Sequence, residues 1–183
     1  MRERIIQVAT ELIKKNGLRG FTLDDITGKL SMSKKTLYKY FASKNELISE
    51  IVQRAAEIEK QRVLQEIEHC PTWFEKLNAI LSVYSYPAIP YRVLNELQRY
   101  YPAEQETIAE IRRFREQIAM TVLEEGIAKG EIRDDIDPAI MLLTLTKTVL
   151  SPSEDQFLNA NDITINQLLE QMKKLLFYGI LKR

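Results

Sequence analysis

Cysteine and histidine are almost absent from this chain of 183 residues, which has one of each. A single cysteine, Cys70, excludes an internal disulfide and makes a reducing compartment the simpler expectation. Its neighbour His69 is the only histidine, and two adjacent side chains do not complete a metal coordination shell. The chain also lacks a phosphate-cradling glycine loop, so we expect no metal, no cofactor and no enzymatic activity.

Glycine and proline are scarce as well, at six residues each, and the sequence has no long hydrophobic run. Leucine, isoleucine, glutamate, lysine, arginine and glutamine are abundant instead, which predicts an all-α protein. The longest apolar stretch, Pro138 to Leu150, is too short to cross a bilayer and is broken by threonines and Lys147. The N-terminal residues lack a signal-peptide core, so we expect a cytoplasmic protein with no membrane partner.

Charge is balanced over the whole chain but not along it. Residues 1–50 carry ten Lys and Arg against six Asp and Glu, whereas residues 51–183 carry sixteen against twenty. Within the basic part, residues 26–45 contain five lysines and no acid. A basic head on an acidic body indicates that only the head meets a polyanion.

The first fifty residues predict three helices before a longer one begins. Apolar residues at helical spacing predict a first helix from Arg4 to Lys15, which Asn16-Gly17 ends. Thr22 caps a second helix over residues 23–30, and a third spans residues 33–41. Two short helices joined by a tight turn form a helix-turn-helix, whose second helix enters the major groove of DNA.

The stretch from Ser33 to Phe41 is amphipathic if it is helical. Leu37 and Phe41 lie four residues apart and share the side that faces a core, while the lysines and tyrosines spread over the remaining surface. A run of lysines alone is usually a solvated surface, and that alternative stays open. The helix-turn-helix spacing and the absence of acids favour contact with nucleic acid.

Helical spacing continues to the end of the chain, without a convincing strand or repeat. A capping box formed by Ser43 and Glu46 opens a helix of about 25 residues, long enough to connect the head with the body. In total the sequence predicts about nine helices. The later ones are expected at residues 72–85, 91–101, 103–129, 138–150 and 162–181.

Residues in roughly the first quarter of the chain follow a known sequence motif. They are Gly17, Thr22, Ile26, Ser33, Thr36, Leu37, Tyr38, Phe41, Ser43, Lys44 and Leu47. This pattern resembles the DNA-binding domain of the TetR family of bacterial transcriptional regulators. The resemblance implies a helix-turn-helix domain at residues 1–46, joined by a long helix to a helical ligand-binding and dimerisation domain at residues 47–183. It also implies a DNA-binding regulator, a ligand-responsive repressor that binds a palindromic operator as a homodimer. An activator or a helical adaptor of the same fold is the alternative.

The resemblance assigns expected roles to residues of the head. Thr22 and Lys44, which stand at helix starts, are expected to hold phosphates, and Tyr38 and Tyr40 to press on the backbone or on a thymine methyl. The other polar residues of the third helix are expected to reach the groove of double-stranded DNA. They are Lys34, Lys35, Thr36 and Lys39.

Two departures from the family pattern bear on DNA binding. Ser31 replaces the glycine of the turn, which costs about 1 kcal/mol if the backbone there is left-handed. Lys35 replaces a glycine of the third helix and adds a bulky cation that could meet a phosphate or a guanine. The operator therefore cannot be transferred from a relative.

Aromatic residues gather in the middle of the chain. Aromatics at helical spacing are more often plain core, but the resemblance implies a small-molecule cavity in the body, where tyrosine hydroxyls could orient an apolar or aromatic effector. The candidate effector residues are Trp73, Tyr84, Tyr91, Tyr101, Phe114 and Met120.

The last two helices carry more apolar surface than one small body can cover. They are either interior helices of a monomer or, as the resemblance favours, half of a four-helix dimer interface. A symmetric dimer would present two heads to a palindromic site. The candidate interface residues are Leu142, Leu143, Leu168, Met172, Leu175 and Leu176.

Overall fold

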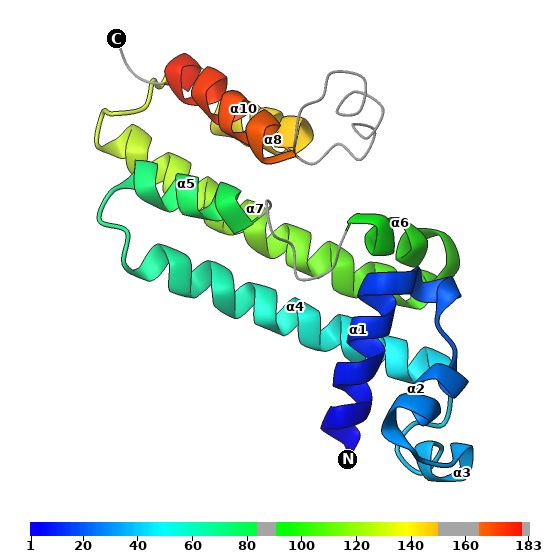
Figure 1. Ribbon diagram of the computed structural model, residues 1–183. Coiled ribbons are helices and arrows are strands. Elements are labelled where there is room, and N and C mark those ends of the chain that lie inside the picture. The colour runs from blue at the N-terminus through cyan, green and yellow to red at the C-terminus, as the bar shows by residue number, and fades with distance from the viewer. Residues whose placement is uncertain (84–90, 150–164, 181–183) are drawn as a thin grey trace. The chain divides into compact units, whose positions relative to one another are not determined.

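The structure is a computed structural model that describes residues 1–83, 91–149 and 165–180 (Figure 1). These ranges contain nine α-helices, one 3-10 helix and no β-strand, which confirms the predicted all-α fold. None of the helices described is long and apolar enough to span a membrane. The helices are α1 (Arg2–Gly20), α2 (Leu23–Leu30), α3 (Lys34–Leu37), α4 (Lys44–Glu68), α5 (Trp73–Val83), α6 (Tyr91–Tyr100), η1 (Pro102–Glu104), α7 (Gln105–Ala128), α8 (Pro138–Val149) and α10 (Ile165–Ile180).

Packing divides the chain into two compact units, each made of two segments. The first unit comprises Met1–Glu59 and Ala88–Glu110, and the second comprises Lys60–Pro87 and Ile111–Arg183. Helices α4 and α7 therefore contribute residues to both units. The boundaries of these units differ from the functional boundary expected after residue 46. That functional boundary stays a prediction.

The core of the first unit is built by α6 as well as by α1 to α4. Ile5 and Ala9 of α1, at helical spacing, are completely buried together with Leu47 of α4. Val93 and Leu97 of α6 enter the same cluster, and Figure 1 shows α6 beside the C-terminal end of α1. The helix-turn-helix, which ends at Phe41, thus shares its core with a helix that begins at Tyr91.

The C-terminal end of α1 departs from regular helix at Gly17. The sequence predicted that this glycine ends the helix, and its φ of 78° and ψ of 174° do break the helical geometry there. One further turn follows and extends α1 to Gly20. A positive φ is readily adopted by glycine, which has no β-carbon to clash with the backbone.

Helix α3 is shorter than the helix predicted over residues 33–41. It covers Lys34–Leu37 only, and residues 38–40 form a turn. The reason lies in the backbone bonding, because the N–H groups of Lys39 and Tyr40 donate to carbonyls three residues earlier instead of four. The reading element is therefore a short helix followed by a tight turn, and we call residues 33–41 the reading segment.

The second unit has a core of its own around Trp73. The Trp73 side chain is 2 % exposed and packs with Leu77 of α5 and Leu123 of α7. Its indole N–H donates a hydrogen bond to the carboxylate of Glu131. Gly126 makes room for this packing, since a β-carbon at that position would lie 2.5 Å from Ile132 and 3.0 Å from the Trp73 ring.

Candidate nucleic-acid interface

Thr22 fixes the start of the helix-turn-helix. Its hydroxyl oxygen accepts a hydrogen bond from the Asp25 N–H at 3.2 Å, and the Asp25 carboxylate accepts one from the Thr22 N–H at 2.7 Å. This capping box lowers the pKa of Asp25, because the bonds from Thr22 stabilise its charged form. The structure thus places this predicted phosphate contact at an exposed helix cap.

Ser31 forms the turn between α2 and α3 in a left-handed conformation. Its φ and ψ are 50° and 46°, and no other non-glycine residue in the described part of the chain has a positive φ. The Met32 N–H donates to the Thr27 carbonyl at 3.0 Å, which closes the end of α2. The backbone at Ser31 is therefore left-handed, which was the condition for the expected strain. The strain costs about 1–2 kcal/mol of folding free energy.

Buried and exposed side chains separate cleanly along the reading segment. Leu37 and Phe41 are 0 % and 1 % exposed and anchor the segment in the core of the first unit, as predicted. Tyr38 and Tyr40 are 50 % and 37 % exposed. The fold therefore presents both aromatic rings to solvent, although each offers an apolar surface that would normally be covered.

Ser33 and Thr36 stabilise the first turn of α3. The Ser33 hydroxyl accepts a hydrogen bond from the Thr36 N–H at 3.1 Å, and the two hydroxyl groups are 2.9 Å apart. Thr36 is half-buried. Its predicted contact with the groove would therefore be made by a side chain already fixed by a cap.

Lys34 forms an ion pair with Asp24 at the start of α2. The ammonium lies 2.8 Å from the Asp24 carboxylate, and both side chains are exposed, at 57 % and 67 %. The hydrogen bond with Asp24 raises the pKa of Lys34. An exposed pair of this kind adds little to stability, but it places an acid beside a lysine expected to reach DNA.

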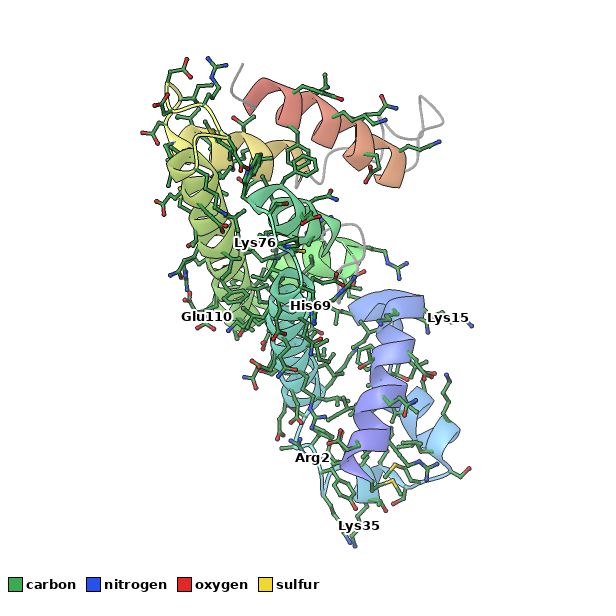
Figure 2. The ribbon with its side chains drawn as sticks, turned by 90° about the vertical axis from the view of Figure 1, so that its left-hand side faces the viewer. Arg2, Lys15, Lys35, His69, Lys76 and Glu110 are labelled. Carbon is green, nitrogen blue, oxygen red and sulfur yellow. The ribbon has the colours of Figure 1, made fainter. Side chains whose placement is uncertain are left out.

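Lys35 and Lys39 are exposed and have no ion-pair partner within the described ranges. Figure 2 labels Lys35 at the tip of the reading segment. Two unpaired ammonium groups beside two exposed tyrosines give the segment both charge for phosphates and apolar surface for bases. These four side chains form the surface that we call the reading surface: Lys35, Tyr38, Lys39 and Tyr40.

Lys44 lies differently from the other predicted DNA contacts. Its ammonium donates to the carbonyls of Leu18 at 2.9 Å and Phe21 at 2.6 Å, and lies 4.1 Å from the centre of the Phe21 ring. Partial burial lowers the pKa of Lys44. Two of its three N–H donors are thus used inside the protein, while its predicted phosphate contact stays a prediction.

An ion-pair network at the N-terminus was not predicted from the sequence. Arg2 pairs with Glu50 of α4 and lies 4.7 Å above the Phe41 ring, while Arg54 bridges Glu50 at 2.9 Å and Glu3 at 2.5 Å. The bond from Arg2 lowers the pKa of Glu50. The only indication of this network in the sequence is the spacing of Glu50 and Arg54, which lie four residues apart on one helix.

The predicted effector residues fall in both cores. Trp73 and Phe114 pack in or against the core of the second unit, and Met120 of α7 is half-buried. Tyr101 packs against the core of the first unit, where burial raises its pKa. Tyr84 and the side chain of Tyr91 lie outside the described residues.

The predicted interface residues lie on α8 and α10 of the second unit. Leu143 and Leu175 are 50 % and 77 % exposed, whereas Leu142, Leu168 and Met172 are half-buried. The side chain of Leu176 lies outside the described residues. Two further exposed apolar side chains, Ile140 and Tyr178, stand on the same two helices.

The short capped helices, the tight turn and the basic reading surface define a helix-turn-helix DNA-binding protein. Comparison with known proteins agrees. The chain is 26 % identical to the uncharacterized HTH-type transcriptional regulator YvaF of Bacillus subtilis, over 98 % of this chain and 95 % of that one. It is 28 % identical to the HTH-type transcriptional repressor KstR2 of Mycolicibacterium smegmatis, over 74 % and 69 % of the two chains. The class is that of transcriptional regulators and not of enzymes.

The head of the molecule also matches a family model. Residues 5–51 match the model of bacterial regulatory proteins of the tetR family. The fold agrees over the full length. The transcriptional regulator FadR of Bacillus subtilis, solved with stearoyl-CoA, superposes with a TM-score of 0.70 at 21 % identity, over 98 % of this chain and all of that one.

Proposed function

We propose that the protein is a ligand-responsive repressor that binds a palindromic operator as a homodimer. The reading surface carries this proposal, because it exposes two unpaired lysines and two tyrosines on a segment anchored by Leu37 and Phe41. The relative KstR2, which is named a repressor, supports the direction of regulation. Its site of action would be DNA in the cytoplasm.

For Thr22 and the residues of the reading surface we propose a division between affinity and sequence choice. Thr22 at its helix cap, together with Lys39, would contact phosphates, which give binding without sequence information. Lys35 would reach a base edge, since lysine donates well to the O6 and N7 atoms of guanine. Tyr38 and Tyr40 would pack on the sugar-phosphate backbone or on a thymine methyl.

Dimerisation would use α8 and α10. Leu143 and Leu175 expose large apolar surfaces on these helices, and Ile140 and Tyr178 add to them at 55 % and 74 % exposure. Apolar surface of this kind is commonly covered by a second copy of the same chain in a twofold arrangement. The dimer would then present two reading surfaces to successive half-sites.

The effector would be a small apolar or aromatic molecule bound in the second unit. FadR, which shares the fold, was solved with stearoyl-CoA, a ligand with a long apolar chain. Phe114 and Met120 are partly buried in the second unit and would line such a site. Binding would release DNA only if the effector prefers the conformation that does not bind DNA.

The test is binding of the purified protein to the DNA upstream of its own gene, measured at several salt concentrations. We expect saturable binding that weakens with salt, with a slope of about 0.9 per phosphate contact. Lys35→Ala should change the preference among base substitutions in the site, whereas Lys39→Ala should weaken all sequences alike. Absence of saturable binding at low salt would instead identify a helical adaptor, and raised transcription in the presence of the bound protein would identify an activator.

A further inference from the structure

The helix-turn-helix is closed at its base by one side chain. Residues 22–43, which include α2 and the reading segment, run between Phe21 and Lys44. The Lys44 ammonium donates to the carbonyl of Phe21 at 2.6 Å and to that of Leu18 at 2.9 Å, so it joins the two ends of this loop. The position of the reading segment therefore depends on where residues 18–22 are held. These residues, which we call the link, run from the break in α1 at Gly17 to the start of α2.

That link is held from its other side by α6. The carboxylate of Glu96 accepts a hydrogen bond from the Leu18 N–H at 2.6 Å, and the Arg19 N–H lies 3.4 Å from the same oxygen. Leu18 thus has its N–H bound to an anion of α6 and its carbonyl bound to a cation of α4. Hydrogen bonds to charged groups are stronger than those between neutral groups, so this residue is firmly fixed.

Further contacts of α6 surround this point. Arg92 donates to the carbonyls of Lys14 and Lys15, at 3.2 and 3.3 Å, just before the break in α1 at Gly17. The guanidinium of Arg19 lies 5.0 Å from the centre of the Tyr100 ring. Helix α6 therefore caps the end of α1 with one cation and binds the following link with one anion.

We infer that Glu96 is a positioning residue for DNA binding, and that α6 therefore contributes to the function of the DNA-binding head. This inference rests on the proposed DNA-binding function. Glu96 acts through Leu18, because a shift of the link moves Phe21 and with it the contact to Lys44. Both ends of the loop that carries the reading segment then move, although Glu96 itself does not touch DNA.

The experiment compares Glu96→Ala, Glu96→Gln and Glu96→Asp with the wild-type protein. The probes are a duplex from the DNA upstream of the gene and a duplex of equal length and scrambled sequence. We expect Glu96→Ala to bind the upstream duplex roughly tenfold more weakly, whereas Glu96→Gln, which keeps an acceptor oxygen, stays within about threefold. Amide hydrogen exchange should become faster at Leu18 and Arg19 in Glu96→Ala and stay near the wild-type rate in Glu96→Gln.

The matched control is Glu110→Ala, which removes the same charge from the first unit. Glu110 is exposed and lies on α7 (Figure 2). We expect this variant to bind within about twofold of the wild type, because a single distant charge changes a screened interaction only slightly. If it weakens binding as much as Glu96→Ala, a general disturbance of the first unit and not positioning by Glu96 explains the effect, and the inference fails.

The remaining outcomes are also decisive. If Glu96→Ala does not fold, Glu96→Asp decides. This variant keeps the charge but moves the carboxylate back by one methylene group. Normal DNA affinity in Glu96→Asp together with faster amide exchange at Leu18 overturns the inference. Normal affinity in a folded Glu96→Ala overturns it as well. A wild-type protein that binds neither duplex refutes the proposed function, and with it the premise on which the positioning role rests.

Discussion

The carboxylate of Glu96 occupies the space beside Gly17 in which a side chain would stand. A β-carbon added to Gly17 would lie 2.5 Å from one Glu96 oxygen and 3.0 Å from the other. Gly17 also has a φ of +78°, a conformation that residues with a β-carbon rarely adopt. Backbone geometry and a contact from α6 therefore both select glycine at this position.

Gly17→Ala should lower the free energy of unfolding by about 1–3 kcal/mol, from backbone strain and from displacement of Glu96. The measurement is urea denaturation followed by circular dichroism. Gly28→Ala is the matched control, because Gly28 lies inside α2 and a β-carbon there meets nothing within 4 Å. The control should raise stability by about 0.5–1 kcal/mol; equal effects of the two changes would contradict the argument.

Ser31→Gly should stabilise the protein by about 1 kcal/mol, since glycine adopts the left-handed turn conformation without steric cost. The thermal midpoint of unfolding should rise accordingly. Ser31→Ala retains the β-carbon and should give no comparable gain. A gain from alanine equal to that from glycine would show that the backbone conformation is not the cause.

Lys44→Met should destabilise the first unit by about 2–3 kcal/mol, because it leaves the carbonyls of Leu18 and Phe21 without a charged donor. Lys39→Met removes an exposed lysine and should leave the midpoint of urea unfolding within about 0.5 kcal/mol of the wild type. Equal midpoints for both variants would mean that the Lys44 ammonium is not held internally.

Glu50→Gln tests the network around Arg2 through its pH dependence. The bonds from Arg2 and Arg54 hold the folded-state pKa of Glu50 below its ordinary value of 4.5. The carboxylate therefore contributes stability above pH 4.5, and this contribution is lost as the pH falls through the lowered pKa. The wild type should be more stable than the variant at neutral pH, and thermal melts should converge as the pH falls below the lowered pKa of Glu50; a difference that stays constant with pH would refute the assignment.

Asp24→Asn tests whether Asp24 restrains Lys34 on the DNA-facing side. In the wild type Lys34→Ala should weaken binding to a scrambled duplex by less than about twofold, since the lysine is already paired. In the Asp24→Asn background the same change should cost about three- to tenfold and reduce the salt slope by about 0.9. Equal effects of Lys34→Ala in both backgrounds, measured by fluorescence anisotropy, would show that the pair does not compete with DNA.

The sequence predicted the features of the head that depend on neighbouring residues. The caps at Thr22 and Ser33 each involve a partner three residues away, and periodicity identified Leu37 and Phe41 as core. The predicted helix over residues 33–41 was too long, because two N–H groups bond three residues back and form a turn. Periodicity cannot distinguish these two bonding patterns over so few residues.

Contacts between distant parts of the sequence could not be predicted. Glu96 and Leu18 are 78 positions apart, and no local pattern in α6 indicates that one of its carboxylates binds the α1–α2 link. Lys44 illustrates the same limit, because family resemblance suggested a phosphate contact while the fold directs its ammonium to internal carbonyls 23 and 26 residues earlier. Side-chain direction depends on tertiary packing that a single sequence does not contain.

Trp73 gives the unmodified protein a built-in optical probe. It is the only tryptophan of the chain, and it lies in the core of the second unit with its indole N–H donating to Glu131. Its fluorescence therefore reports on the second unit. Titrations with small molecules can thus be followed through one intrinsic chromophore, without attaching a label to the protein.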